Sequence, residues 1–351
     1  MKKKIILSII LIFVLGIVGC KATVGSGNGD VQPIDNESPI IADYYPFLEN
    51  TILKYDGIGN EFAEQDAYFE FIEKDRAQIK IINPGTHVVK VLERKDGKLS
   101  EVYYEGEFYH IENLLDIKEN TENILLKEPL EIGNQWKTPE GYIRKITAID
   151  KSIETPFKTI EALEVTTDFG NGKIQRQYYG KNIGFVASIY EDGDTTIKTL
   201  LNSMKESSLE FDIDVFYPLN SDIDTVYVKD RLDFQTNQNL ERILEHVMKN
   251  PPSDKLMPVM PKSAGINSIK LDKNSWILRV DLKEEFITDS NMGSALETEI
   301  LKSMVNTLGR FYDVENVYIS VDGKPYESGH YSLKEQESFK VDIEGIKEFT
   351  R

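Results

Sequence analysis

Histidine and carboxylate side chains are the groups of this 351-residue chain that could catalyse a reaction or hold a metal ion. The four histidines are scattered without the spacing of a zinc site on one helix or hairpin, and they are His87, His110, His246 and His330. His110 lies two residues before Glu112, so both side chains could point to one face of a strand. A metal ion would need further ligands, which the sequence around this pair does not supply. We therefore expect an exposed polar strand edge there, and no metal or cofactor site.

Paired acids are the second arrangement that could do chemistry, because a glycosidase uses two carboxylates. Glu284 is followed by Glu285, and Glu297 lies two residues before Glu299. With 59 acidic residues in the chain, such pairs are expected from abundance, so we interpret them as a solvated face. The sequence has no HExxH, GxSxG or phosphate-binding glycine motif. We predict no catalytic residue and no enzyme; an envelope hydrolase would need a carboxylate or histidine cluster that only folding brings together.

Tyrosines form a third set, because aromatic faces on a sheet can stack on sugars or peptides. The candidates for such a platform are Tyr103, Tyr104, Tyr109, Tyr178 and Tyr179. Alternation along a strand turns about half of the side chains in these runs inward as core, and tyrosine is a favoured strand residue in any case. The tyrosines therefore support an alternative function, in which a β-rich domain recognises cell-wall glycan or peptide.

Short alternating runs separated by tight-turn pairs fill the chain from residue 41 to residue 209. The runs are 88–94, 99–104, 107–111, 142–149, 159–167, 173–179, 184–190 and 195–201. Asp96-Gly97 and Asp192-Gly193 are typical hairpin turns between them. The pattern predicts an antiparallel β-rich domain with one covered apolar face, built as a curved sheet or half-barrel, with a short helical segment at 111–118.

The pattern changes between residues 210 and 335. Apolar residues recur at helical spacing in 240–248, which ends at Asn250-Pro251-Pro252, and again in 296–311. Strand-like runs surround these helices, at 213–217, 226–234, 269–271, 276–282 and 317–321. The sequence thus predicts an α+β chain, whose second domain is compact and has the order ββαββαβ.

Ordered motifs within this second unit resemble the sporulation and spore-germination domain, GerMN. The motif residues are Asp281, Phe286, Gly293, Ser294, Asn306, Asp322 and Gly323. The resemblance implies a non-enzymatic role at the envelope of an endospore-forming bacterium, through contacts with envelope, sporulation or germination proteins, or with further copies of the chain. The motif residues also suit roles in folding, because Asp322-Gly323 is a turn pair and Ser294 could cap a helix with Glu297 three residues on.

The N-terminus has the pattern of a secretory signal peptide. Lys2, Lys3 and Lys4 precede an apolar run of 14 residues, shorter than the about 20 that span a membrane. Residues 17–20, Ile-Val-Gly-Cys, resemble the bacterial lipobox, in which the cysteine is acylated. Cys20 is the only cysteine, so the chain can form no internal disulfide. The formal charge of −18 argues against a nucleic-acid partner.

We therefore predict that Cys20 anchors the chain by lipid to the extracytoplasmic face of the cell membrane. The predicted segments are a signal peptide (1–19), a flexible tether (20–40), the β-rich domain (41–209), the GerMN domain (210–335) and a C-terminal tail (336–351). The predicted function is binding or assembly in sporulation or germination. The alternative is the cell-wall role of the tyrosines, with peptidoglycan as the partner.

Overall fold

The computed structural model describes residues 39–221, 224–290 and 292–350, which pack as one compact unit. The predicted signal peptide, Cys20 and nearly all of the predicted tether lie outside the described residues. Within the described ranges, no helix is long and apolar enough to cross a membrane.

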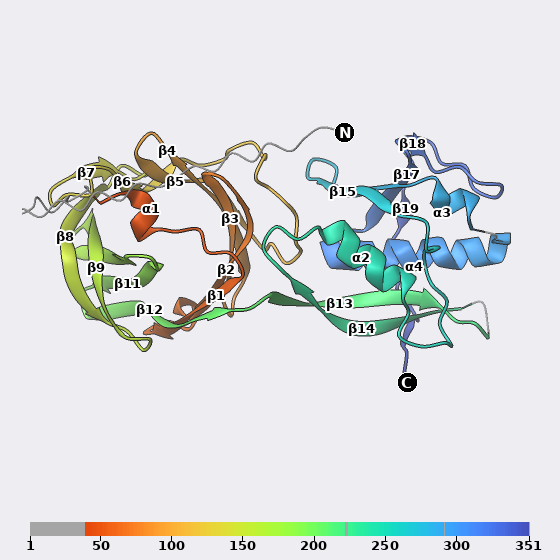
Figure 1. Ribbon diagram of the computed structural model, residues 1–351, viewed down its shortest axis with the longest axis horizontal. Coiled ribbons are helices and arrows are strands. Elements are labelled where there is room, and N and C mark those ends of the chain that lie inside the picture. Colours follow the sequence, from red (N-terminus) through yellow and green to blue (C-terminus); the bar gives the residue numbers. More distant parts are fainter. Residues whose placement is uncertain (1–38, 222–223, 291, 351) are drawn as a thin grey trace, which may run out of the picture. The chain divides into compact units, whose positions relative to one another are not determined.

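The first half of the described chain is a curved antiparallel sheet of twelve strands (Figure 1). Its strands are β1 (Thr51–Ile58), β2 (Gln65–Glu73), β3 (Arg76–Ile82), β4 (His87–Lys95), β5 (Lys98–Gly106), β6 (Asn123–Lys127), β7 (Gln135–Lys137), β8 (Ile143–Glu154), β9 (Thr159–Gly170), β10 (Lys173–Gly180), β11 (Gly184–Asp192) and β12 (Thr195–Glu206). Their order is β6-β5-β4-β3-β2-β1-β12-β11-β10-β9-β8-β7. The first strand, β1, therefore pairs with the last, β12, and the two edges of the sheet are β6 and β7. The expected curved sheet is confirmed.

The two edge strands of this sheet approach each other through side chains rather than through a ladder of backbone bonds. The Trp136 indole on β7 donates a hydrogen bond of 2.9 Å to the Ile124 carbonyl on β6. Arg144 on β8 reaches the same carbonyl at 2.5 Å and Asn123 Oδ1 at 3.0 Å. The sheet is therefore nearly closed, and it encloses a hollow that contains the short helix α1 (Ile41–Tyr44) and an apolar cluster.

Turn chemistry explains why the predicted hairpins form. Asp96 and Gly97 both have positive φ, at 51° and 66°, which the two-residue turn between β4 and β5 requires. The prediction fails after β5, where neither the strand at 107–111 nor the helix at 111–118 forms. Phe108 and Ile111 are buried there in a cluster that also contains residues of the second half, so tertiary packing overrides the local alternation.

The second half has two sheets with the longest helix between them (Figure 1). Its elements are β13 (Leu209–Pro218), β14 (Thr225–Phe234), α2 (Leu240–Lys249), β15 (Ile266–Asp272), β16 (Ile277–Leu282), α3 (Glu285–Thr288), α4 (Ser294–Tyr312), β17 (Asn316–Val321), β18 (Lys324–Pro325), β19 (Phe339–Lys340) and β20 (Lys347–Glu348). One sheet has the order β13-β14-β20, and the other β15-β16-β17-β18 with β19 also on β17. The α+β class is confirmed, and the order includes the one-turn helix α3 and three short strands beyond those expected.

Helix α4 packs against both sheets of this half, on β13 and β14 on one side and on β17 on the other. The Thr307 hydroxyl on α4 accepts a hydrogen bond of 2.9 Å from the Phe216 amide on β13. Gly309 leaves room for Val341, whose Cγ2 would lie 2.1 Å from an added Cβ. Residues 336–351, predicted as a tail, thus supply β19 and β20 to the two sheets and pack against α4.

Candidate binding site at the junction of the two halves

The loop between β14 and α2 docks on strand β2 by hydrogen bonds. Asn237 Nδ2 donates to the Ile72 carbonyl at 3.0 Å, and Asn237 Oδ1 accepts from the Ile72 amide at 2.8 Å. The Asn237 amide also donates to the Glu70 carbonyl at 2.9 Å, and Thr236 Oγ1 to the Phe69 carbonyl at 2.8 Å. Asn237 has φ of 64°, a left-handed conformation that asparagine tolerates. Four bonds to three β2 carbonyls and one β2 amide fix the orientation of the loop.

A charged network lies buried beneath this docked loop. Lys80 Nζ on β3 lies 2.8 Å from Glu70 Oε1 on β2, as a close charge contact rather than a well-directed hydrogen bond, and both side chains are almost fully buried. Lys80 Nζ donates instead to the His110 carbonyl at 2.5 Å. Gln78 Nε2 donates to Glu70 Oε2 at 2.6 Å, while Gln78 Oε1 accepts from the Leu114 amide at 2.7 Å. The network holds the irregular segment that follows β5 against the sheet.

The predicted pair His110 and Glu112 belongs to the same junction, so the expectation of an exposed polar edge is wrong. The side chains are only 8% and 14% exposed, and His110 Nε2 lies 3.6 Å from Glu112 Oε2. The His110 ring packs between Phe108, with ring centroids 4.2 Å apart, and Tyr312 of α4, at 4.9 Å. Among the described residues, no group of three or more His, Cys, Asp or Glu side chains could hold a metal ion.

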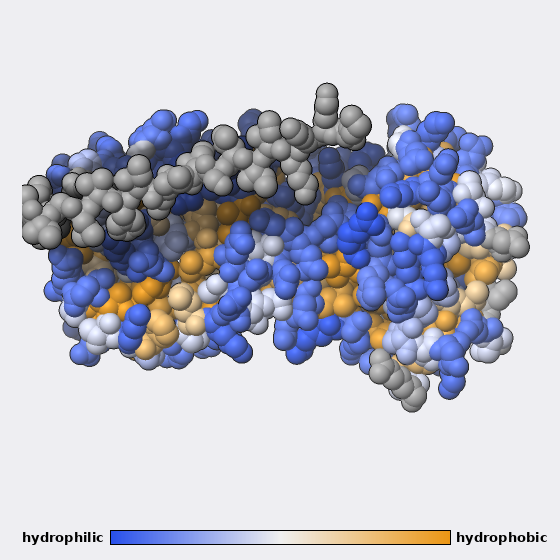
Figure 2. Space-filling model, viewed as in Figure 1, coloured by the Kyte–Doolittle hydropathy of each residue, from blue (hydrophilic) through white to orange (hydrophobic). Residues whose placement is uncertain are grey.

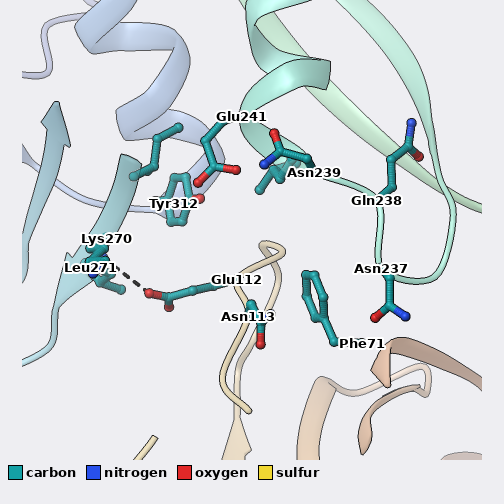
Figure 3. Close-up of a pocket in the computed structure, with 12 residues that line it drawn as sticks. Phe71, Glu112, Asn113, Asn237, Gln238, Asn239, Glu241, Lys270, Leu271 and Tyr312 are labelled. Carbon is teal, nitrogen blue, oxygen red and sulfur yellow. Dashed lines mark hydrogen bonds between the residues drawn. The ribbon is translucent and has the colours of Figure 1, made fainter. Parts of the chain in front are cut away.

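A cleft of about 490 Å³ opens at the surface of this junction (Figure 3). It is lined by Phe71, Glu112, Asn113, Asn237, Gln238, Asn239, Leu240, Glu241, Ile269, Lys270, Leu271 and Tyr312. Figure 3 shows Glu112 and Glu241 reaching into it from opposite halves, with the Tyr312 ring between them. The Leu271 amide donates to Glu112 Oε1 at 3.4 Å, whereas Glu112 Oε2 is buried without a hydrogen-bond partner in the described part of the chain. A cleft on which several polar side chains converge is suited to ligand binding.

The cleft favours hydrogen bonding to a polar ligand. Burial raises the pKa of Tyr312 well above its ordinary value, and the charges of Glu112 and Glu241 raise this pKa further. Tyr312 thus stays neutral as a hydrogen-bonding group. Asn239 Oδ1 caps α2 by accepting from the Arg242 amide at 2.8 Å, which leaves the NH₂ of Asn239 as a donor. Carboxylate acceptors, amide donors and two aromatic rings together are groups that recognise sugars and peptides.

The five tyrosines predicted as a ligand platform do not form one surface. Tyr103, Tyr178 and Tyr179 are buried, at 7%, 4% and 1% exposure, whereas Tyr104 and Tyr109 are half exposed. Tyr103 donates a hydrogen bond of 2.6 Å to Glu105 and accepts one of 3.1 Å from Lys273 of the second half. The prediction of an exposed platform is therefore wrong for three of the five tyrosines. Tyr103 lies at the junction of the two halves, and Tyr178 and Tyr179 of β10 lie in the core.

Three predicted motif residues, Asp281, Asp322 and Gly323, come together where strands β16 and β17 end. Asp281 Oδ1 accepts from Ser320 Oγ at 2.6 Å and from the Gly323 amide at 2.8 Å. Asn267 Nδ2 bridges Asp281 Oδ2 at 2.9 Å and Asp322 Oδ1 at 3.0 Å. Burial alone would raise the pKa of Asp281, but these hydrogen bonds outweigh it and lower the pKa. The Asp281 carboxylate thus fastens the β17–β18 turn to β16.

The other motif residues lie in the core or at helix ends. Phe286 is fully buried, and Asn306 holds residue Asp342 through bonds of 2.6 and 2.8 Å to its backbone. Gly293 occupies the N-cap position of α4, and Ser294 begins the helix without a side-chain cap bond. The predicted capping role of Ser294 is therefore wrong.

Glu297 is unavailable as a capping partner because its carboxylate has other partners. It accepts hydrogen bonds from Tyr326 at 2.7 Å and lies 2.6 Å from His330 Nδ1. At 3% exposure, Glu297 is also not part of a solvated face, contrary to the interpretation of the Glu297 and Glu299 pair. The junction cleft itself was missed, because no motif in the sequence signals that residues 71, 112, 241 and 312 meet.

The fold and the junction define a protein in which an α+β domain is docked rigidly on a curved antiparallel sheet. Residues 214–327 match the model of the Germane family, described as sporulation and spore germination. The chain is therefore a Germane-domain protein, as its sequence motifs predicted. No curated protein matches the chain.

Parts of the chain are similar to several solved structures. The tandem GerMN domains of the sporulation protein GerM from Bacillus subtilis share 16% identity over 36% of this chain and 46% of that one, with a TM-score of 0.29. The chain thus spans less than half the length of that structure. The first GerMN domain of the same protein shares 16% identity over 33% and 86% of the two chains, with a TM-score of 0.26. A candidate lipoprotein from Clostridium perfringens shares 18% identity over 39% of this chain and 93% of that one, with a TM-score of 0.25.

Proposed function

We propose that the chain is an exported envelope protein, anchored by lipid on Cys20, that acts in sporulation or spore germination by binding other molecules rather than by catalysis. The observation that carries this proposal is the Germane match over residues 214–327. The docked loop at Asn237 supports a binding role, since it holds the Germane domain in one orientation. A fixed orientation reduces the entropy that a partner must overcome on binding.

The outer face of the β15–β17 sheet offers a surface for a partner. Lys270 on β15 lies directly opposite Arg279 on β16, and like charges in this arrangement destabilise a strand pair. The Arg279 guanidinium lies 5.1 Å from the centre of the Tyr318 ring on β17. The only nearby carboxylate within ion-pair distance of Arg279 in the described chain is Asp272, at 3.9 Å. In a chain of formal charge −18, two neighbouring cations suit an acidic surface of an envelope partner.

Gene replacement in the source organism tests the role. Deletion of the gene should lower spore yield or slow germination, and the wild-type chain should restore both. A chain with Lys270→Glu and Arg279→Glu should fold yet fail to restore them. The matched control reverses two exposed cations of β8, with Lys145→Glu and Lys151→Glu, and should restore the phenotype fully. Normal spore yield and normal germination in the deletion strain would refute the proposed role.

The anchor has its own test by cell fractionation. Cys20→Ala should release the folded chain into the medium and abolish function, because confinement near the membrane raises its effective concentration for neighbours there. If the Cys20→Ala chain remained with the membrane fraction, the lipid anchor would be ruled out. If it were released but fully active, anchoring would not belong to the mechanism.

A further inference from the structure

The hollow of the curved sheet contains a second cavity, of about 270 Å³, away from the junction cleft. Strands from both halves of the sheet line it, and the lining includes Gln65, Ile79 and Ile81 from the first half and Gln175, Gln177 and Phe185 from the second. Figure 2 shows apolar side chains gathered in the space that these strands enclose. Most of the lining residues are only partly buried, so the cavity is open to solvent.

Three glutamines face this cavity from positions where a sheet interior normally carries apolar residues. Gln177 Oε1 is buried and has no hydrogen-bond partner in the described part of the chain. Gln175, two residues earlier on β10, donates from Nε2 to Ser188 Oγ at 3.0 Å, which leaves its carbonyl oxygen for another donor. Gln65 lines the opposite wall on β2. A buried amide without a partner costs stability, so its presence requires water or a ligand that supplies the missing bond.

Charge limits what that ligand can be. Lys90 is the one charged residue of the lining, and its Nζ lies 2.7 Å from a carboxylate oxygen of the buried Glu101. The cavity therefore presents no free charge that would replace the solvation of an ionic group. The remaining walls are apolar or aromatic, with the Phe185 ring 6.1 Å from that of Tyr179.

We propose that this hollow binds a neutral amphipathic molecule. Its apolar part packs between Ile79, Ile81 and Phe185, and its amide or hydroxyl head hydrogen-bonds to Gln175 and Gln177. The volume is just below the usual range of about 300–1,000 Å³ for ligand pockets, so the bound part is small. It is either a free small molecule or one end of a larger amphiphile. The site goes beyond the proposed function, since all of its residues lie outside the Germane match. If no ligand bound in this hollow, the proposed role in sporulation or germination would be unaffected.

Calorimetric titration of the full chain tests this assignment with three probes. Octanamide represents a free neutral ligand, octyl glucoside represents the sugar end of an amphiphile, and octanoate differs from octanamide only in its charged head. At least one of the neutral probes should bind saturably, and octanoate should bind at least about tenfold more weakly. Whichever neutral probe binds more tightly indicates the source of the ligand.

Two variants separate a ligand contact from a structural one. Gln177→Leu should weaken binding of the neutral probe by about tenfold, the effect of one lost hydrogen bond, while Tm stays constant or rises. Ile81→Phe, which fills the cavity, should abolish binding, and the control Gln135→Leu, on the exposed edge of β7, should leave both binding and Tm unchanged. Equal binding of octanoate, or no saturable binding of either neutral probe, would overturn the proposal. So would a Gln177→Leu chain with lower Tm and unchanged binding, because the amide would then be structural.

Discussion

The buried pair Glu70 and Lys80 yields the sharpest prediction about stability. Lys80→Met preserves most of the side-chain volume but removes the ammonium group 2.8 Å from Glu70 Oε1 and its hydrogen bond to the His110 carbonyl. Glu70 is then left as a fully buried carboxylate with one side-chain donor, Gln78. Removing one partner of a buried ion pair costs about 3–5 kcal/mol, because the remaining charge is uncompensated. We expect Lys80→Met to lower the free energy of unfolding by this amount.

Urea unfolding followed by tyrosine fluorescence measures this loss. The matched control is Lys54→Met, which removes a pair of similar length, 2.9 Å to Asp66, whose side chains are 57% and 38% exposed. An exposed pair contributes about 0–1 kcal/mol. The double variant Glu70→Gln, Lys80→Met should recover most of the loss, since no buried charge remains. A Lys80→Met chain no less stable than Lys54→Met would refute the reasoning about desolvation.

Two further predictions concern the Germane half. Burial alone would raise the pKa of Glu297, but hydrogen bonds from Ser328, Tyr326 and His330 outweigh it, so the pKa is lower in the folded than in the unfolded chain. The Glu297 carboxyl therefore binds fewer protons in the folded than in the unfolded chain. Its stabilisation is fully present above the pKa of the unfolded state and is lost as the pH falls through the pKa of the folded state. In Glu297→Gln, Tm should therefore decrease less steeply as the pH is lowered. Gly309→Ala should cost about 1–3 kcal/mol in urea unfolding because its Cβ meets Val341, whereas Gly329→Ala, in a loop with open space around it, should not. A Gly309→Ala chain as stable as Gly329→Ala would contradict the packing of residues 336–351 on α4.

Local patterns predicted the regular parts of the fold. The hairpin from β4 to β5 was predictable because Asp96-Gly97 determines the turn and the flanking runs alternate. Helix α4 was predictable because its apolar residues recur at helical spacing. The segment after β5 was not, since Phe108 and Ile111 alternate like strand residues but are buried in contacts with the other half of the chain. Local alternation carries no information about a surface that comes from more than 100 residues away.

The candidate sites were less predictable than the fold for the same reason. Glu112 was singled out for its spacing from His110, but its partners in the cleft, Glu241 and Tyr312, come from two helices of the other half. Gln175 and Gln177 did carry a signal that was overlooked. They occupy the same side of a strand as Tyr179, which is core, so two amides on an inward face indicate either a cost in stability or a function.

The shared core determines how the two halves should be studied. One apolar cluster contains Tyr68 of the curved sheet and Phe108 of the segment after β5, together with Phe234, Leu278 and Tyr312 of the second half. The Tyr68 hydroxyl donates to the Phe234 carbonyl at 3.1 Å, across the boundary that the sequence suggested between residues 209 and 210. Cutting there would expose part of this cluster on both fragments, and large exposed apolar patches promote aggregation. A fragment that fails to bind or to function would therefore report loss of the core rather than loss of a site, so the full chain with substituted side chains separates the two where a fragment does not.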